Sequence, residues 1–373
     1  MPVSPFTYEY PVAPADVIDR GEESERLLEL VTAGRFVRLL APRRYGKTSL
    51  LRKVLAEADK QGIPTVLVDF YGVVSVAEVA HRIERAYAEQ LHGKLRTLAE
   101  RFLNASGFGV SLGAVGISVS LERTRNPDPV PALHTLLELP LQALMKTGVM
   151  PVVVFDEFQD ILPIEHVDAL MSSHIQHHGG KVSYVFSGSE PGMMRELFER
   201  RARPMYGQAL PERLGRLRDA DVAEYIHDRF ERTGKRAGET LPALLGVAQG
   251  HPQRAMLLAH HLWQATPRRG SADQGAWERA IQASEAEVRD ELRAYWRGLQ
   301  TNDQRALRAL SAANGKPYRL QALTNVDLKK SSATHAYERL LDRGDLERTA
   351  EEELIFVDPL LERWVHRQGT SAG

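Results

Sequence analysis

Residues 41–49 read APRRYGKTS, and they stand between an apolar run that ends at Leu40 and a helical pattern that begins at Thr48. The segment fits the phosphate-binding pattern G-x-x-x-x-G-K-[ST], which requires a strand before it and a helix after it. Backbone N–H groups of such a loop and of the following helix N-terminus form a cradle for phosphate. The segment therefore predicts a nucleotide-binding loop, in which Ala41 replaces the first glycine and restricts the turn.

Each residue type in this loop suits a bound ATP molecule with Mg²⁺. Gly46 lets the backbone approach the phosphates, and the ammonium group of Lys47 would neutralise the β- and γ-phosphates. The hydroxyl of Thr48 would reach Mg²⁺, and Ser49 would lie near the α-phosphate. The ATP-binding residues predicted in the loop are Ala41, Pro42, Arg43, Arg44, Tyr45, Gly46, Lys47, Thr48 and Ser49.

A second motif, VVVFDEFQD at residues 152–160, places two acids directly after an apolar run. Asp156 would hold Mg²⁺ together with Thr48, and Glu157 would orient and deprotonate the attacking water. The alternative is a solvated strand end, where acids are common. Because the chain also contains the phosphate loop, we expect Asp156, Glu157 and Lys47 to form a catalytic centre.

Four short apolar runs predict strands, at residues 36–40, 64–70, 150–156 and 182–187. They lack period-two alternation, which favours strands that are buried on both faces, as in a parallel sheet. Helical patterns lie between them, so an α/β fold, a P-loop αβα sandwich, is expected over residues 1–216. Residues 107–122 alternate around glycines and predict an inserted β-hairpin, or a decorative insertion without a role of its own.

Only helical patterns follow Leu217, and they predict an all-α lid over residues 217–298. Residues 299–373 show helical patterns, then two short strands around Glu351–Glu353, then a last amphipathic helix. This is the order of a winged-helix domain, which usually binds DNA.

The charge of this last domain leaves its partner open between DNA and protein. From residue 299 onward, basic and acidic residues balance, whereas DNA-binding modules are usually positive. Glu351–Glu353 would repel DNA, but one helix carries a polar face that suits phosphate and base contacts. The candidate DNA contacts on that face are Lys329, Lys330, Thr334, His335 and Arg339.

The composition excludes several classes of protein. The 373 residues suffice for two or three domains, and the net charge of −1 indicates no general attraction to nucleic acid or anionic membranes. The chain has no cysteine, which excludes disulfides, thiolate metal sites and cysteine nucleophiles. No apolar run is long enough to span a membrane and no secretory signal is visible, so a cytoplasmic protein is expected.

Histidines gather at His174, His177 and His178, just before two glycines. A metal site needs a third ligand and a defined geometry, which the spacing does not supply. The position favours a polar cluster at a helix C-terminus.

Several motifs together resemble the archaeal-type ATPases, a STAND branch of the AAA+-related P-loop proteins. The carrying segments cover most of the chain: VIDRGEESERL, APRRYGKTSLLRK, LVDFYGVVSVAEVA, VVVFDEFQDI, VFSGSEPGMM, ARPMYGQAL, GHPQRAMLLAHHLW and VDPLLERWV. The resemblance implies an ATP-binding ATPase with Mg²⁺ as cofactor. It also implies a monomer at rest that self-associates when ATP binds.

The resemblance also assigns residues outside the two motifs. Arg20 would approach the nucleotide base, although Asp19 replaces the usual glycine before it. Pro252 would contact the nucleotide from the lid, and Arg254 is either a sensor-two arginine or a surface residue of the lid helix. Ser187 or Ser189 would take the sensor-one position beside the catalytic acids, and Ser187 is the first choice.

Gln208 stands where the family often has an arginine that completes a neighbour's site. Arg200, Arg201 and Arg203 lie just upstream and are substitutes, or they are ordinary surface arginines. Ala41 and Gln208 support an alternative function, a non-hydrolysing nucleotide-dependent regulator or scaffold. A small-molecule kinase is disfavoured by the lid and the winged helix.

Overall fold

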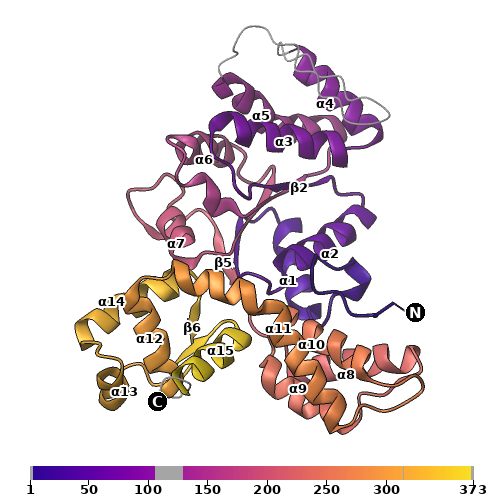
Figure 1. Cartoon of the computed structure of the whole chain (residues 1–373). Helices are drawn as coiled ribbons and strands as arrows, with labels where there is room; N and C mark the ends of the chain where they lie inside the picture. Colours follow the sequence, from indigo (N-terminus) through magenta and orange to yellow (C-terminus); the bar gives the residue numbers. More distant parts are fainter. Residues whose placement is uncertain (1–2, 106–128, 314, 371–373) are drawn as a thin grey trace.

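The computed structural model describes residues 3–105, 129–313 and 315–370. An α/β sandwich forms the upper part of the molecule in Figure 1, and two helical parts lie below it. The hairpin expected at residues 107–122 lies outside the described residues. Within the described part of the chain, none of the helices is both long and apolar enough to cross a membrane.

The sandwich is built on a five-stranded parallel sheet in the order β2-β3-β4-β1-β5. The strands are β1 (Val37–Leu40), β2 (Thr65–Asp69), β3 (Val152–Asp156), β4 (Ser183–Gly188) and β5 (Leu210–Arg213). The predicted four strands are present, and β3 and β4 are buried throughout, as their apolar runs indicate. β5 is a correction to the sequence analysis: its residues LPER form an exposed edge strand, which has no apolar run to reveal it.

Alternate side chains of the strands serve two different cores. Val152 and Val154 pack with α1 (Gly21–Thr32) and α2 (Lys47–Lys60) on one face of the sheet. Val153 and Phe155 face the opposite core. The helices of that side are α3 (Val76–Gln90), α4 (Gly93–Ala105), α5 (Pro129–Thr147), α6 (Val167–His177) and α7 (Pro191–Glu199), and the 3₁₀ turn η2 (Phe158–Ile161) belongs to the same core. The 3₁₀ turn η1 (Pro14–Asp16) lies beside α2.

The lid is a helical bundle with its own core, into which Phe6 of the N-terminal segment is inserted. Its elements are α8 (Asp219–Arg232), η3 (Gly238–Thr240), α9 (Leu241–Ala248), α10 (Pro252–Ala265) and α11 (Gln274–Gly298). The insertion of Phe6 fastens the start of the chain to the lid.

The last part of the chain has the expected winged-helix order. Its elements are α12 (Thr301–Ala312), α13 (Leu320–Asn325), α14 (Lys330–Asp342), the antiparallel pair β6 (Leu346–Arg348) and β7 (Leu354–Phe356), and α15 (Pro359–Thr370). Its core continues into the lid through Leu257, Val288 and Leu292. The predicted fold class, a parallel αβα sandwich followed by a helical lid and a winged helix, is confirmed.

Candidate functional site

The loop between β1 and α2 is shaped to receive an anion. Gly46 takes the left-handed conformation at φ 84° directly before α2, and no side chain among the described residues caps the N-terminus of that helix. A Cβ atom on Gly46 would meet nothing within 4 Å, so the backbone conformation rather than crowding requires glycine there. The first N–H groups of α2 therefore lack a side-chain acceptor, as at anion-binding helix ends.

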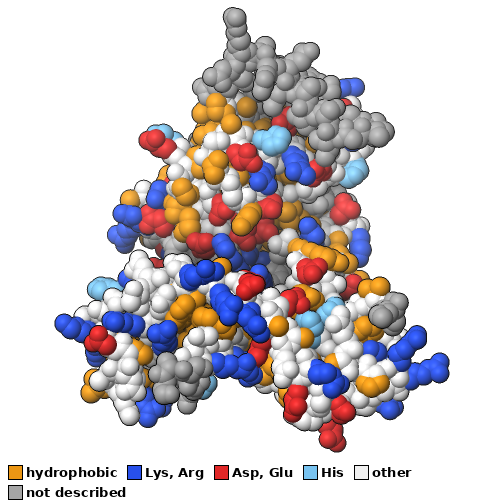
Figure 2. Space-filling model, viewed as in Figure 1, with side chains coloured by type: hydrophobic (Ala, Val, Ile, Leu, Met, Phe, Trp, Pro, Cys, Tyr) orange, Lys and Arg blue, Asp and Glu red, His pale blue; other side chains and the backbone are white. Residues whose placement is uncertain are grey.

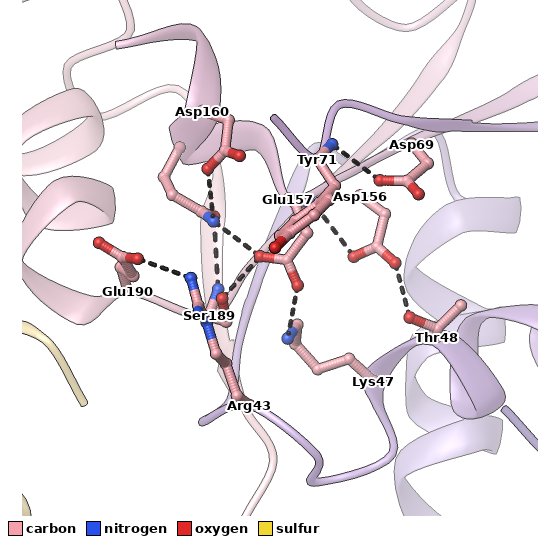
Figure 3. Close-up of polar contacts among 11 residues, drawn as sticks. Arg43, Lys47, Thr48, Asp69, Tyr71, Asp156, Glu157, Asp160, Ser189 and Glu190 are labelled. Carbon is pink, nitrogen blue, oxygen red and sulfur yellow. Dashed lines mark hydrogen bonds and ion pairs between the residues drawn. The ribbon is translucent and has the colours of Figure 1, made fainter. Parts of the chain in front are cut away.

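The two sequence motifs meet at this loop. Lys47 Nζ lies 3.3 Å from Glu157 Oε1, and Thr48 Oγ1 donates a hydrogen bond of 2.7 Å to Asp156 Oδ2 (Figure 3). Lys47 is only 5% exposed. The structure thus brings together the ammonium, the hydroxyl and the two carboxylates that the sequence analysis selected.

Glu157 is held by several contacts directly after β3. Its backbone is left-handed at φ 49°, which is unusual for a residue with a side chain. Gln159 Nε2 and Ser189 Oγ each donate a hydrogen bond of 2.6 Å to Glu157 Oε2. Burial raises the pKa of Glu157, but Lys47 and these two donors lower it further than burial raises it. The net pKa lies below the ordinary value, so Glu157 is ionised at neutral pH.

A third carboxylate, Asp69, stands opposite Asp156 in the pairing of β2 with β3. Its pKa is raised, first by burial and also by the negative charge of Asp156. Asp69 Oδ1 accepts a hydrogen bond from the Tyr71 backbone N–H. The edge of the sheet therefore carries more negative charge than the two predicted acids alone, which suits a divalent cation.

Ser187 and Ser189 are separated by the structure. Ser187 is completely buried, and its Oγ has no hydrogen-bond partner among the described residues. Ser189 instead donates to Glu157. The first choice of Ser187 is therefore corrected: Ser189, just beyond the end of β4, is the serine that contacts Glu157.

A cavity of about 390 Å³ opens beside this cluster. Residues from the predicted set line it: Arg20, Arg43, Arg44, Tyr45, Gly46, Lys47, Thr48, Ser49, Glu157 and Pro252. Ala41, Pro42, Asp156, Ser187 and Arg254 do not belong to the lining described for it, although Asp156 is bonded to Thr48. Arg20 is fixed by hydrogen bonds to Glu23 Oε1 and to the Gly215 carbonyl.

The N-terminal segment contributes a wall that the sequence analysis missed. Tyr8, Tyr10, Val12 and Ile18 line the cavity, and the Val12 N–H donates a 3.1 Å hydrogen bond to Ser49 Oγ. Tyr8, Tyr10 and Val12 precede the first quoted motif, VIDRGEESERL, and Ile18 stands inside that motif without a role assigned to it. The aromatic and aliphatic side chains give the cavity an apolar end opposite its charged end.

Arg254 is placed away from the cavity, which corrects its prediction as a nucleotide contact. It is 1% exposed, and its Nε donates a 3.0 Å hydrogen bond to Asp358 Oδ1 at the start of α15. His251 caps α10 by accepting from the Arg254 N–H, and its ring lies edge-on to Tyr45 at 5.0 Å. The guanidinium joins the lid to the last domain instead of reaching a nucleotide.

Tyr45 and Arg216 join the sandwich to the same domain. Tyr45 Oη lies 3.4 Å from Glu347 Oε1 on β6, and Arg216 Nε donates to that oxygen at 2.7 Å. Arg216 also donates to the Phe356 and Gln249 carbonyls. On the face seen in Figure 2, acidic and basic side chains lie next to one another along the junction between the sandwich and the lower parts. We call Tyr45, Arg216, Arg254, Glu347 and Asp358 the C-terminal contact.

The candidate DNA contacts lie in different environments. Lys329 and His335 are exposed, Lys330 stands over the Tyr318 ring at 5.6 Å, and Thr334 Oγ1 donates to the Lys330 carbonyl. Arg339 is corrected: its guanidinium pairs with the buried Asp303 of α12. The end of α14 is also tied to the sandwich, through an ion pair between Asp342 and Arg195 of α7.

The substitutes for an arginine finger are engaged in the sandwich. Arg200 and Arg203 pair with Glu196, and Arg203 also pairs with Asp168. Gln208 donates to the Ser172 hydroxyl at 2.8 Å. Arg201 is exposed. None of these four residues belongs to the lining of the cavity in the described structure.

Comparisons with known proteins agree with this architecture. Residues 11–90 match the family model of the AAA-like domain. No curated protein matches the chain. The fold is similar to that of the Walker-type ATPase PABY2304 of Pyrococcus abyssi, with a TM-score of 0.71, 17% identity, and coverage of 96% of this chain and 99% of that chain. It is also similar to the ORC2 protein of Aeropyrum pernix in ADPNP–ADP complexes, with a TM-score of 0.60, 13% identity and 98% coverage of both chains.

A further similar structure is the Aeropyrum pernix ORC1 protein in complex with DNA, with a TM-score of 0.50, 15% identity, and coverage of 95% of this chain and 94% of that chain. At these identities the likeness concerns the fold, and it extends over the lid and the last domain as well as the sandwich. The predicted resemblance to archaeal P-loop ATPases is confirmed at that level. Residues 11–90 therefore resemble an AAA-like domain, and the whole described fold is similar to that of the Walker-type ATPase of Pyrococcus abyssi and of the ORC2 protein of Aeropyrum pernix.

Proposed function

We propose that this protein binds ATP with Mg²⁺ in the cavity beside residues 41–49 and hydrolyses the bond between its β- and γ-phosphates. The observation that carries the proposal is the meeting of Lys47, Thr48, Asp156 and Glu157 at one end of that cavity. An uncapped helix N-terminus and a buried ammonium suit phosphate, and adjacent hydroxyl and carboxylate oxygens suit Mg²⁺. Neighbouring folds that hold ADP and ADPNP support the choice of ligand.

Each residue would have a distinct task. The ammonium group of Lys47 pairs with Glu157 in this structure, and in the complex it would leave Glu157 and pair with the β- and γ-phosphates. Thr48 and Asp156 would hold Mg²⁺, whose role is to neutralise charge on the phosphates. Glu157, ionised and freed from Lys47, would accept a proton from the attacking water, with Ser189 and Gln159 fixing its orientation. The tyrosines and Ile18 of the N-terminal segment would face the base, with Arg20 beside them.

Arg43 and Arg44 complete the cradle in this proposal. Arg43 pairs with Glu190 and Arg44 with Glu291, and the side chains of both arginines are largely exposed. Exposed ion pairs contribute about 0–1 kcal/mol, so phosphate can displace either carboxylate at little cost. Both arginines line the cavity and are within reach of an anion bound there.

We further propose that the nucleotide state controls the last domain. The units would be an ATPase core over residues 1–216, a lid over 217–298 and an output domain over 299–373. Tyr45 lies in the phosphate loop and also in the C-terminal contact, and Pro252 lines the cavity one residue after His251. Binding of ATP would therefore act on the lid and on the wing together. The protein would rest as a monomer and self-associate with ATP.

The partner of the output domain is proposed to be DNA, with a protein as the rival. A similar fold is known in complex with DNA. Since Arg339 pairs with Asp303, the positive charge for phosphate comes from Lys329 and Lys330. Double substitution Lys329→Glu with Lys330→Glu should abolish anisotropy-detected DNA binding in low salt with ATP. Absence of binding by the unmodified protein under those conditions would favour a protein partner.

Radiolabelled ATP tests the enzymatic proposal. Glu157→Gln should bind ATP as the unmodified protein does but release phosphate at least about 100-fold more slowly, since the general base is lost. Glu165→Gln is the control, because Glu165 is exposed in the segment that follows the same strand. If the unmodified protein binds ATP but never releases phosphate, with or without DNA, the non-hydrolysing regulator is the correct function.

A further inference from the structure

Two histidine-containing pairs face each other across the helices α5 and α6. His134 and Glu138 are four residues apart on α5, and His174 and His178 are four residues apart at the end of α6. Residues with this spacing share one face of a helix. The two helices pack against each other on the far side of the sheet from α1 and α2 (Figure 1).

Three side chains of these pairs place their donor atoms together. His174 Nδ1 lies 2.8 Å from Glu138 Oε1, and His178 Nε2 lies 3.8 Å from the same oxygen. All three ligand atoms lie within 4.8 Å of one another. Ligands about 2.0–2.2 Å from a tetrahedral zinc ion are ~3.3–3.6 Å apart, a spacing that the observed distances bracket. The set of two histidines and one glutamate also occurs among zinc ligands.

The other nitrogen of each ring is also occupied. His174 Nε2 lies 2.6 Å from His134 Nδ1, and His178 Nδ1 lies 2.8 Å from Tyr184 Oη on β4. A histidine that binds a metal usually donates its second N–H to a neighbour, which fixes the tautomer and the ring. When His174 Nε2 and His178 Nδ1 carry the ring protons and donate in these two contacts, His174 Nδ1 and His178 Nε2 present their lone pairs to a metal ion.

His178 supplies an independent observation. The residue is completely buried, and its Nε2 has no hydrogen-bond partner within the described part of the chain. A buried nitrogen without a partner destabilises the folded protein, because it has lost its hydrogen bond to water. A metal ion between this nitrogen and Glu138 would remove this destabilisation.

We propose that Glu138, His174 and His178 bind a Zn²⁺ ion. The side chains of Glu138 and His174 are 33% and 13% exposed, so the ion can enter from solvent and keep a water as its fourth ligand. The sequence analysis lacked a third ligand because Glu138 lies 36 residues before His174. The ion would fasten α5 to α6 and, through Tyr184, to β4.

Zinc titration of the full-length protein tests the site. The protein should be free of affinity tags, stripped of metal with a chelator and kept without nucleotide. Calorimetry should show one Zn²⁺ per chain, and Co²⁺ should give the visible absorption of a tetrahedral site. Glu138→Gln and His174→Ala should each weaken Zn²⁺ binding at least about 100-fold, more than loss of an outer-shell partner costs. Both residues retain some exposure, so these variants should fold, as circular dichroism would verify.

Two controls separate this site from other histidines and from the nucleotide cavity. His177→Ala removes an exposed histidine next to His178 and should leave Zn²⁺ affinity unchanged. Asp156→Ala alters the proposed Mg²⁺ site and should also leave the affinity for Zn²⁺ unchanged. The proposal is overturned if the unmodified protein binds no Zn²⁺, if His177→Ala weakens binding as much as Glu138→Gln, or if Asp156→Ala alone abolishes it.

Discussion

The cavity beside residues 41–49 and the C-terminal contact use similar polar residues under very different constraints. At the cavity, Lys47 meets Glu157 and Thr48 meets Asp156, and the proposed binding of phosphate and Mg²⁺ would require these residue types. In the C-terminal contact, Arg254 meets Asp358 only to join two parts of the chain. Any complementary pair could serve there. The difference teaches that an interacting pair can be recognised in the sequence when the chemistry of a ligand requires its residue types. A pair that only joins two parts of the fold cannot be recognised in this way.

Tyr45 belongs to both regions. It is part of the phosphate loop, yet it is buried between the His251 ring and Glu347 of the wing. Burial raises the pKa of Tyr45 well above its ordinary value, so the phenol stays neutral. Substitutions of other residues can disrupt one region while leaving the other intact.

The largest effect is expected for Lys47→Ala. Loss of the buried ammonium should weaken Mg-ATP binding at least about 1000-fold, or roughly 4 kcal/mol, because the phosphates lose their main counter-charge. Lys60→Ala, at the exposed end of the same helix, is the control and should bind ATP normally. Retention of affinity by Lys47→Ala in calorimetry would contradict the assignment of the cavity.

A smaller effect, on stability instead of binding, is expected for Arg254→Met. Burial raises the pKa of Asp358, and the Arg254 guanidinium lowers it by more, so the substitution would leave a buried carboxylate without its partner. Breaking such a buried pair lowers the free energy of unfolding by about 3 kcal/mol. Urea unfolding should show this loss, while ATP affinity should change less than about threefold, since Arg254 lies outside the cavity. Arg232→Met, which removes an exposed pair on α8, is the matched control. A tenfold loss of ATP affinity in Arg254→Met would restore Arg254 as a nucleotide contact.

The pH dependence of stability is expected to depend on His251. Burial lowers the pKa of His251 to about 3, with Arg254 and Arg216 adding to the shift and Asp358 opposing it. His251 binds a proton more readily in the unfolded chain than in the folded protein. The free energy of unfolding is therefore highest above the ordinary pKa of 6.5, where His251 is neutral in both states, and it decreases as the pH falls from there toward 3. Between pH 7 and pH 5 the loss is about 2 kcal/mol.

His251→Asn tests this expectation, since asparagine can still cap α10 but does not titrate. The fall in unfolding free energy between pH 7 and pH 5 should be smaller in the variant by that amount. An equal fall in both proteins would show that His251 is accessible to protons in the folded state.

The smallest effect is expected beside the cavity, at Ser187 and Ser189 near the end of β4. Ser189→Ala removes one hydrogen bond to Glu157 and should lower kcat about tenfold, or roughly 1.4 kcal/mol. Ser187→Ala removes a hydroxyl without a described partner and should change kcat less than twofold. The reverse ranking in steady-state phosphate release would return Ser187 to the role first assigned to it.

Much of the fold could be predicted because apolar runs and turn residues mark buried strands. β3 and β4 are buried throughout, and each contains an uninterrupted apolar run, VVVF in β3 and YVF in β4. β5 escaped because the edge of a sheet tolerates the residues LPER. The four helices and two strands described in the last domain were also visible from their periodicity and turns.

The charged end of the cavity was predictable, and its apolar end was not. Lys47, Thr48, Asp156 and Glu157 stand in two short motifs, whereas Tyr8 and Tyr10 come from a segment in which no motif was recognised. Arg254 was predicted to contact the nucleotide and Arg339 to contact DNA. Both predictions failed because the sequence around an arginine on a helix does not show whether its side chain meets a ligand or a carboxylate far away in the chain. Their partners, Asp358 and Asp303, are 104 and 36 residues away.

The direct bond between the phosphate loop and the wing has a thermodynamic consequence. Tyr45 and Glu347 are in contact, so any ligand that separates them must alter the free energy of whatever occupies the loop. Such coupling is reciprocal: if ATP changes the affinity of the wing for its partner by a given factor, the partner changes the affinity of the loop for ATP by the same factor. A partner of the last domain would therefore act as a nucleotide-exchange or nucleotide-retention factor without ever touching the nucleotide.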